Sequence, residues 1–570
     1  IIKLVREKNV SPEKILVLTF SNKAALEIKK RLDGQIADSE KIFVSTFHSF
    51  GLNILKIYYN QKEEDALEII DYDCAYNLVK KYLDVPKNKI KNFLNKVSLY
   101  KQGICFENEN ENEKFFGQYS NLLNSRNIID IDDLVYLPVE LLKNDHNILL
   151  KIRNMYEWIL IDEFQDINSK QYEFVKLVSG IMPNLFVIGD PDQSIYGFRG
   201  SDVRFIKEFA DDYSSAKIIN LKHSYRCPDI IIKAGGQILN KKEYMSGCYD
   251  NLKIIIKECD TSGSESDWIA RQIDQMTGGL RHFSIDSSVS DGSESEGISG
   301  LGDFAVLCRT SLMYESIKQA FDNYSIPYQI VGEKPFYKNE PFNTVINFLR
   351  ELVLKNKIIN SKKIFADNKE ILYKDVSGNE EILMLLDKNF EIIDSMICEK
   401  KSISEIFEFI SKIIPGQNNE ITNDFNKIIE FGKSYTNNYS EFLIKILLNS
   451  SIDFFTIDSE KVSVMTIHSA KGLEFKTVFI PGCEEGIIPF ELYEKKKLED
   501  IEEEKRLFYV GITRTSKYLF LTHSKKRVIK GKIFYPARTR FIDSIEKTLY
   551  DRSIRIKLKP RINENLELPL

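Results

Sequence analysis

The sequence lacks several features that would point to other classes of protein. Its eight cysteines are scattered over 570 residues and form no CxxC pair. That spacing argues against a zinc site, an iron–sulfur cluster and a disulfide framework, and it fits a reducing cytoplasm. No apolar run reaches the roughly 20 residues that a membrane span needs. The formal net charge is −5, so any nucleic-acid contact must lie in a local basic groove.

A phosphate-binding loop is missing as well, because no G-x-x-x-x-G-K-[ST] pattern occurs anywhere in the chain. The first residues, 1–8, resemble the end of an amphipathic helix and are neither a signal peptide nor a plausible chain start. We therefore expect that an amino-terminal piece precedes Ile1. At this length two to four domains are expected.

The sequence does contain short apolar runs that end in polar or aromatic residues. Parallel strands open onto a ligand crevice at their carboxyl ends, so four such runs predict a shared crevice. The predicted strands are 15–19, 42–46, 158–161 and 185–188.

The strand at 158–161 ends at a pair of carboxylates, Asp162 and Glu163. Asp162 is suited to hold Mg²⁺ through an oxygen ligand. Glu163 is suited to polarise a water for attack on a γ-phosphate. A solvated acidic turn is the alternative, and the following Gln165 and Asp166 make it the weaker one.

The run from Gly189 to Gly200 combines a nucleotide sensor with aromatic residues. Gln193 lies just past a strand end, where an amide can sense a γ-phosphate or orient a water. Tyr196, Phe198 and Arg199 follow, and they suit stacking on unpaired bases and contact with phosphate. A glycine-rich turn with core aromatics is the alternative interpretation.

A second run, residues 464–475, passes from a strand into a Ser/Ala/Gly loop with amides that can receive phosphate, including Gly472. Glu474 is suited to ribose hydroxyls, and Thr466 and His468 to a nucleic-acid backbone. For His468 alone, a structural role is the better interpretation. Two arginines, Arg226 and Arg514, are candidates to stabilise charge on a transferring phosphoryl group, although single arginines more often form surface salt bridges.

The predicted fold class is α/β, with two parallel-sheet cores, each interrupted by a helical insertion domain. Two further stretches carry no predicted chemistry: an acidic loop at 107–113 and a disordered Ser/Gly-rich loop at 284–302. The expected domains are the first core (1–53 and 151–217), its helical insert (54–150), the second core (218–347 and 459–545), its short insert (348–458) and a tail (546–570). The second core is expected to begin with a strand near 218–221.

These runs together resemble the UvrD/Rep-type superfamily 1A DNA helicases, and the matches cover nearly the whole chain in the family order. The segments that carry the resemblance are Thr19–Ala25, Thr46–His48, Asp130–Leu134, Asp162–Asp166, Gly189–Gly200, Tyr225–Arg226, Gly332–Tyr337, Thr466–Phe475, Tyr509–Arg514 and Arg538–Ile542.

The resemblance implies that the two parallel-sheet cores are RecA-like motor cores. It also implies an ATP- and Mg²⁺-dependent motor that moves 3′→5′ along single-stranded DNA and separates duplex at single-strand/duplex junctions. By residue matching, Asp162 binds Mg²⁺ and Glu163, beside the metal, is the base that activates the water. Gln193, Arg226, Gly472, Glu474 and Arg514 complete the nucleotide site. The strand would contact Phe20, Asn22, His48, Tyr196, Phe198, Arg199, Thr466 and His468. A monomer or weak dimer, with repair or replication proteins as partners, is expected.

Three departures from the family pattern matter. Because the phosphate-binding loop is absent, we expect residues 1–570 alone not to hydrolyse ATP at family rates; robust DNA-stimulated hydrolysis would contradict this. Phe198 stands where the family more often has Trp, which reduces the stacking area. The second insert, about 110 residues by this division, is short for the family and leaves processivity open.

Two alternatives remain beside a stand-alone helicase. The helicase subunit of a recombination helicase–nuclease would need a nuclease domain, for which the residues after Ile542 leave no room. A DNA-binding or assembly factor with an inactive motor would fit the absent loop, but the acidic pair, Gln193 and both arginines argue against it.

Overall fold

A computed structural model describes residues 1–61, 68–104, 109–180, 184–248, 254–278, 294–295, 298–332, 335–360, 379–415, 419–449, 453–455, 460–492, 497–551 and 558–559. The chain forms two compact units. The first comprises 1–189, 198–205 and 334–454, and the second comprises 190–197, 206–333 and 455–570. In the described part of the chain no helix has the length and apolar character to cross a membrane.

A parallel sheet is the centre of the first unit, with strand order β2-β1-β5-β6 among the described residues. β1 lies between β2 and β5, with Leu16 level with Phe43 on one side and Ile159 on the other. All five residues of β1 are buried because the sheet is covered on both faces. The elements are α1 (Ile2–Lys8), β1 (Ile15–Thr19), α2 (Asn22–Leu32), β2 (Phe43–Thr46), α3 (Phe47–Gln61), α8 (His146–Met155), β5 (Trp158–Ile161), α9 (Ser169–Ser179) and β6 (Asn184–Val187).

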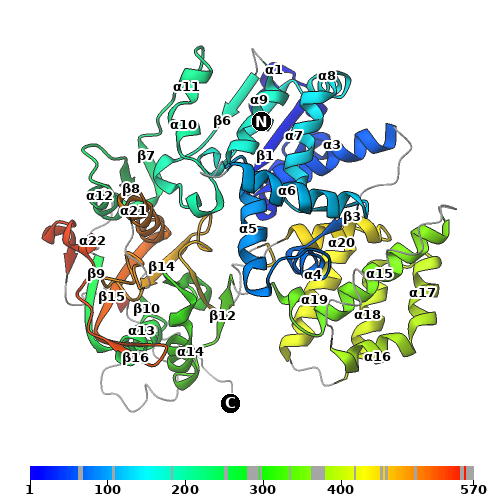
Figure 1. The fold of residues 1–570 in the computed structure, drawn as a ribbon. Helices are drawn as coiled ribbons and strands as arrows, with labels where there is room; N and C mark the ends of the chain where they lie inside the picture. The colour runs from blue at the N-terminus through cyan, green and yellow to red at the C-terminus, as the bar shows by residue number, and fades with distance from the viewer. Residues whose placement is uncertain are drawn as a thin grey trace, which may run out of the picture. The chain divides into compact units, whose positions relative to one another are not determined.

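Two helical segments belong to the same unit (Figure 1). The first segment is not wholly helical, because β3 and β4 form a short parallel pair inside it. Its elements are β3 (Glu68–Ile70), α4 (Tyr72–Tyr82), α5 (Ile90–Lys101), α6 (Glu109–Asn124), β4 (Ile128–Asp130) and α7 (Asp133–Asn144). The second segment consists of α15 (Phe342–Asn360), α16 (Glu380–Lys388), α17 (Phe390–Cys398), α18 (Ile403–Ile413), α19 (Asn419–Lys433) and α20 (Tyr439–Leu448).

The second unit is built on a larger sheet with strand order β12-β13-β11-β14-β15-β9-β17, parallel along this path, and β16 pairs antiparallel with β15. Its strands are β7 (His223–Pro228), β8 (Ser246–Cys248), β9 (Ile254–Thr261), β10 (Glu294–Ser295), β11 (Phe304–Cys308), β12 (Tyr328–Val331), β13 (Val462–Thr466), β14 (Phe475–Ile480), β15 (Thr515–Ile529), β16 (Lys532–Phe534), β17 (Tyr550–Asp551) and β18 (Leu558–Lys559). Its helices are α11 (Phe209–Asp212), α12 (Asp229–Ile238), α13 (Ser262–Met276), α14 (Tyr314–Asn323), α21 (Leu498–Ile512) and α22 (Arg540–Asp543), while α10 (Arg204–Lys207) begins in the first unit.

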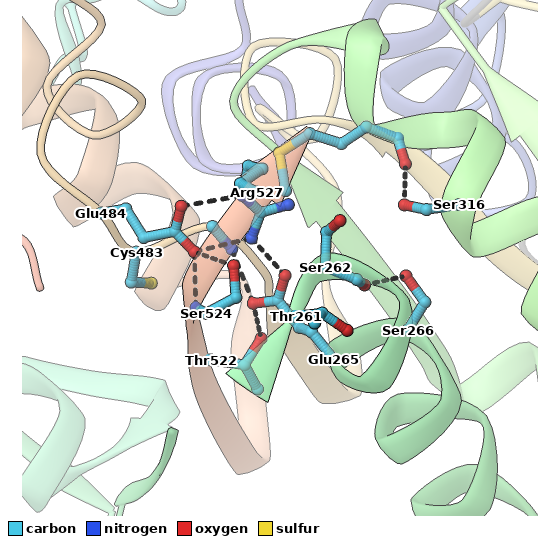
Figure 2. Close-up of polar contacts among 12 residues, drawn as sticks. Thr261, Ser262, Glu265, Ser266, Ser316, Cys483, Glu484, Thr522, Ser524 and Arg527 are labelled. Carbon is cyan, nitrogen blue, oxygen red and sulfur yellow. Dashed lines mark hydrogen bonds and ion pairs between the residues drawn. The ribbon is translucent and has the colours of Figure 1, made fainter. Parts of the chain in front are cut away.

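A buried ion network ties α13, the loop after β14 and strand β15 together in the second unit (Figure 2). Arg527 donates through Nε and Nη2 to the two carboxylate oxygens of Glu484, each at 2.7 Å, and Nη2 also contacts Glu265. Donors from Thr522, Ser524 and Gly482 satisfy the remaining carboxylate lone pairs. Every buried charge in this network therefore has several partners.

The predicted class, α/β with parallel sheets, is confirmed. Two details are wrong. No strand forms at 218–221, where Ile218, Ile219 and Leu221 are more than two-thirds exposed, and the first strand of this part is β7. The acidic stretch 107–113 is not all loop, because α6 begins at Glu109. Most of the predicted loop at 284–302 and of the tail after Asp551 lies outside the described residues.

Candidate functional site

The acidic pair of the first unit lies at the carboxyl end of β5. The Asp162 amide donates to Leu18 O of the neighbouring strand at 2.9 Å, and the Phe164 amide donates to Ile188 O at 2.9 Å. Between these two anchors Glu163 adopts a left-handed backbone conformation with φ 53°. This region is uncommon for residues other than glycine, and such strain clusters at functional sites. The turn therefore holds both carboxylates in a fixed orientation.

The donors around Asp162 suit a hard divalent cation. Both carboxylates are half-buried, and the side-chain amide of Gln165 contacts the Glu163 carboxylate. Thr19 ends the adjacent strand β1, and its buried hydroxyl has no hydrogen-bond partner among the described residues. Because Leu18 pairs with Ile161, Thr19 and Asp162 follow at the same ends of neighbouring strands, and hydroxyl and carboxylate oxygens are the donors that Mg²⁺ prefers. The residues present therefore fit the metal that the resemblance implies.

Gln193 and Arg514 meet in the second unit, although 321 positions separate them in sequence. Arg514 Nη2 donates to Gln193 Oε1 at 3.1 Å, and Gln193 Nε2 donates to Asp190 Oδ2 at 2.8 Å. Arg514 is 1% exposed, and it also donates to Val510 O and Thr513 Oγ1 from the end of α21. The buried Arg514 guanidinium fixes the orientation of the Gln193 amide. A charge placed beside this pair would change the hydrogen bond between them.

The backbone around Gln193 is fixed by further cations of the second unit, which the sequence patterns did not single out. Lys471 Nζ donates to Gln193 O at 2.5 Å and lies 5.3 Å from the centroid of the Tyr196 ring. Arg506 Nε donates to Ser194 O at 2.8 Å. Because these bonds reach main-chain oxygens, no spacing of side-chain types in the sequence could have revealed them.

Arg226 and Glu474, both predicted to bind nucleotide, bind each other in the second unit. Arg226 Nε lies 2.6 Å from Glu474 Oε2, and both side chains are well exposed, so the pair contributes little stability and is easily exchanged for other partners. Gly472 has φ 79° and open space around its Cα. Tyr225, which the motif Tyr225–Arg226 contains but to which no role was assigned, is 87% exposed and is therefore available to stack on a base.

The predicted strand-contact residues of the first unit differ in accessibility. Phe20 is 39% exposed and Phe198 61%, and the Arg199 guanidinium lies 5.6 Å from the Phe198 ring centroid. Asn22 instead donates from Nδ2 to Leu448 O and Asn449 Oδ1. His48 is half-buried, and desolvation lowers its pKa to about 4, so the imidazole is neutral at pH 7.

In the second unit two of the predicted strand-contact residues, Tyr196 and His468, are in contact. Tyr196 is only 9% exposed and donates from its hydroxyl to His468 O at 3.3 Å, with the two rings 6.5 Å apart. Burial therefore leaves little of the Tyr196 ring for stacking, and Phe198 is the exposed member of the predicted pair. Thr466 Oγ1 bonds Ser469 Oγ at 2.9 Å and stays half-buried.

Beside the Tyr196–His468 contact, the structure thus brings together three sets of predicted nucleotide-site residues, each within one unit. Asp162 and Glu163 share one turn in the first unit. Gln193 with Arg514, and Arg226 with Glu474, form two pairs in the second. The assignment of these residues to catalysis and binding remains a prediction.

Comparisons with known proteins agree with the motif order. Residues 1–214 match the family model of the UvrD/REP helicase N-terminal domain, and 219–408 and 390–526 match that of the UvrD-like helicase C-terminal domain.

Curated relatives match over nearly the whole chain. The chain is 28% identical to "ATP-dependent DNA helicase PcrA" of Staphylococcus aureus (strain Mu50 / ATCC 700699), over 98% of this chain and 84% of that protein. It is 28% identical to the "Probable DNA helicase II homolog" of Mycoplasma capricolum, over 96% and 83%. It is 30% identical to "ATP-dependent DNA helicase Rep" of Buchnera aphidicola subsp. Acyrthosiphon pisum, over 95% and 92%. Because the family models and the relatives both span most of the chain, the protein belongs to the UvrD/REP helicase family.

Proposed function

We propose that this protein is an ATP-dependent DNA helicase that moves 3′→5′ along single-stranded DNA. The observation that carries the proposal is the bond from Arg514 to Gln193. Gln193 and Tyr196 lie on one loop, so a change at the Gln193 amide is transmitted over three residues to the contact with His468. A short rigid loop of this kind converts nucleotide state into a change at a nucleic-acid surface.

The acidic pair would perform the chemistry of hydrolysis. Asp162, with the Thr19 hydroxyl nearby, would hold Mg²⁺, and the bound metal supplies charge neutralisation at the phosphates. Glu163 would accept the proton of the attacking water, and its fixed turn orients the carboxylate for that task. Arg226 and Arg514 would stabilise charge on the phosphoryl oxygens, with Gln193 orienting the water.

The remaining predicted residues would hold the nucleotide and the strand. Gly472 and Glu474 would contact phosphate and ribose, and release of Glu474 would free Arg226. Phe20 and Phe198 offer exposed rings for stacking on unpaired bases, and Arg199 adds a cation for the backbone. The other proposed strand contacts are Asn22, His48, Tyr196, Thr466 and His468.

The finer features of the proposal concern organisation and cellular role. We propose the domain boundaries given above, a cytoplasmic location and a monomeric or weakly dimeric state. Single-strand/duplex junctions would be the substrate, in DNA repair, replication or recombination. β12 and β13 are neighbours in one sheet while α15 to α20 lie between them in sequence, which supports a helical insert in the second core.

Strand displacement by the natural full-length protein tests the proposal. Duplexes with a 3′ tail, a 5′ tail or no tail are compared with ATP and Mg²⁺. We expect unwinding from the 3′ tail alone. Glu163→Gln should lower the rate of unwinding by about 10² or more while single-strand binding is kept, because only the base is removed. Unwinding from 5′ tails alone would overturn the polarity, and no unwinding from any tail would overturn the function.

A further inference from the structure

Helix α20 shares an apolar cluster with α3 within the first unit. Ile444, Leu447 and Leu448 of α20 are partly buried against the cluster that contains Leu52 and Leu55 of α3. This apolar contact sets the rotation of α20 about its axis, so the side chains beside the apolar stripe have defined neighbours.

Polar contacts fix the edge of the same helix. Lys445 Nζ donates to Ser49 Oγ at 3.0 Å, and Asn22 Nδ2 donates to Leu448 O at 2.9 Å and Asn449 Oδ1 at 2.8 Å. Ser49 is on α3 and Asn22 is on α2, so the end of α20 lies against both helices. We call this contact of α20 with α2 and α3 the seam, and the half-buried Lys445 lies in it.

Two more lysines approach the seam. Lys29 lies seven residues after Asn22 on α2, and Lys56 lies seven residues after Ser49 on α3, so each falls on the helix face of its predecessor. Desolvation lowers the pKa of Lys445, the charge of Glu441 opposes this, and the charges of Lys29 and Lys56 lower it further. Desolvation also lowers the pKa of Lys29. The charges of Lys29 and Lys56 are therefore close enough to Lys445 to repel its ammonium group.

The seam has an anion at the start of α2, whereas at Lys445 the charges of two further lysines are opposed by that of Glu441. At the start of α2 the Lys23 amide donates to Asp453 Oδ1 at 2.8 Å, so the chain itself supplies the negative charge there. Among the described residues, Lys29, Lys56 and Lys445 form no ion pair. Three cations, of which Lys56 and Lys445 are half-buried, and one neighbouring carboxylate leave a net positive charge that attracts an anion.

We propose that Lys29, Lys56 and Lys445, with the Ser49 hydroxyl, form a binding site for a backbone phosphate of single-stranded nucleic acid. This inference rests on the proposed function and extends the strand path from α2 and α3 to α20. A phosphate between the three ammonium groups removes their mutual repulsion and holds α20 against the first core. Strand binding and docking of the second helical segment would then favour each other.

Lysine labelling measures occupancy of the site without any catalysis. The natural full-length protein is acetylated with an amine-reactive ester, alone, with an oligo-dT strand, and with inorganic phosphate at the same phosphate concentration. We expect oligo-dT to slow labelling of all three lysines several-fold. Inorganic phosphate should not, if the ligand is a nucleic-acid backbone. Lys30 of α2 and Lys412 of α18, both exposed, are the matched controls and should label at unchanged rates.

The salt dependence of binding tests the charge itself. Lys445→Met keeps the aliphatic stem and should make the slope of log affinity against log salt for oligo-dT shallower by about 0.7. Lys445→Arg should restore the slope, and Lys412→Met should leave it unchanged. Equal slopes in Lys445→Met and Lys412→Met, or unchanged labelling with oligo-dT, would overturn this inference alone. Failure of the wild-type protein to bind oligo-dT would overturn the proposed function as well.

Discussion

Two buried ion triads, one in each unit, place a single cation between two carboxylates in different ways. In the first helical segment Lys101 Nζ lies 2.7 Å from Asp130 and 2.8 Å from Asp133. In the second unit Arg527 holds Glu484 with two parallel bonds and also contacts Glu265. Lysine offers a point charge, whereas the guanidinium matches the shape of a carboxylate.

The surroundings of the two triads also shift the pKa values of their charged groups differently. Burial, reinforced by the charge of Asp130, raises the pKa of Asp133 to about 7 and that of Asp132 to about 6, even though Lys101 lies beside them. Around Arg527, burial alone would lower the arginine pKa, but Glu265 and Glu484 raise it. One triad can therefore take up a proton near neutral pH, and the other keeps its charges.

The largest expected effect comes from removing the guanidinium. Arg527→Leu leaves two fully buried carboxylates without their cation, so it should lower the free energy of local opening of α13 and β15 by about 3–5 kcal/mol. Hydrogen exchange of these two elements measures it. A loss of opening free energy below about 1 kcal/mol would contradict the view that the buried carboxylates around Arg527 depend on its charge.

Removing the lysine should cost less because its carboxylates can be protonated. Lys101→Met is expected to lower the opening free energy of the first helical segment by on the order of 2 kcal/mol at pH 8. The loss should shrink at pH 6, where protonated Asp133 carries no charge to compensate. The same exchange experiment at both pH values measures it, and an equal loss at both would contradict the assignment.

The pH dependence of the first helical segment should trace to Asp133. Its folded-state pKa is raised above the unfolded value, so the stability it contributes is present at low pH and is lost as pH rises through about 7. Asp133→Asn should remove a slope of up to about 1.4 kcal/mol per pH unit between pH 5 and 7. Hydrogen exchange corrected for intrinsic rates measures the slope. Asp84→Asn, an exposed site in the same segment, should leave it unchanged.

The smallest effect is expected for an exposed cation on the same strand as Arg527. Lys525 pairs with Asp260 at 3.0 Å and Glu258 at 3.4 Å in solvent. Lys525→Met should leave the exchange of β15 without measurable change, because solvent and salt screen such pairs. A loss similar to that of Arg527→Leu would show that burial is not what distinguishes the network.

Apolar runs predicted most of the central strands. β1 has the predicted bounds, and β2 begins one residue later than expected, because continuous β-branched runs of this length have few alternatives to a covered strand. The run at 218–221 is also mostly apolar but is exposed and irregular. Whether such a run becomes a strand depends on a partner strand elsewhere in the chain, which local composition does not encode.

The residues of the candidate site were predictable from motifs, but their contacts were not. Gln193 and Arg514 were both chosen from their motifs, yet the bond between them depends on how α21 packs against the loop. The contacts of Lys471 and Arg506 were not predicted, because these side chains donate to main-chain oxygens, which no motif marks. Glu163 was expected to be a base, and its left-handed backbone became visible only in the structure.

The parallel pairing of β12 with β13 limits how the chain can be redesigned. Two neighbouring parallel strands need a crossover of a dozen or more residues, because the chain must return to the starting end of the sheet. The segment from α15 to α20 supplies that return path. A minimal motor made by joining Val331 directly to Val462 would lose one of the two strands, whereas a replacement helix of similar span would keep the sheet intact.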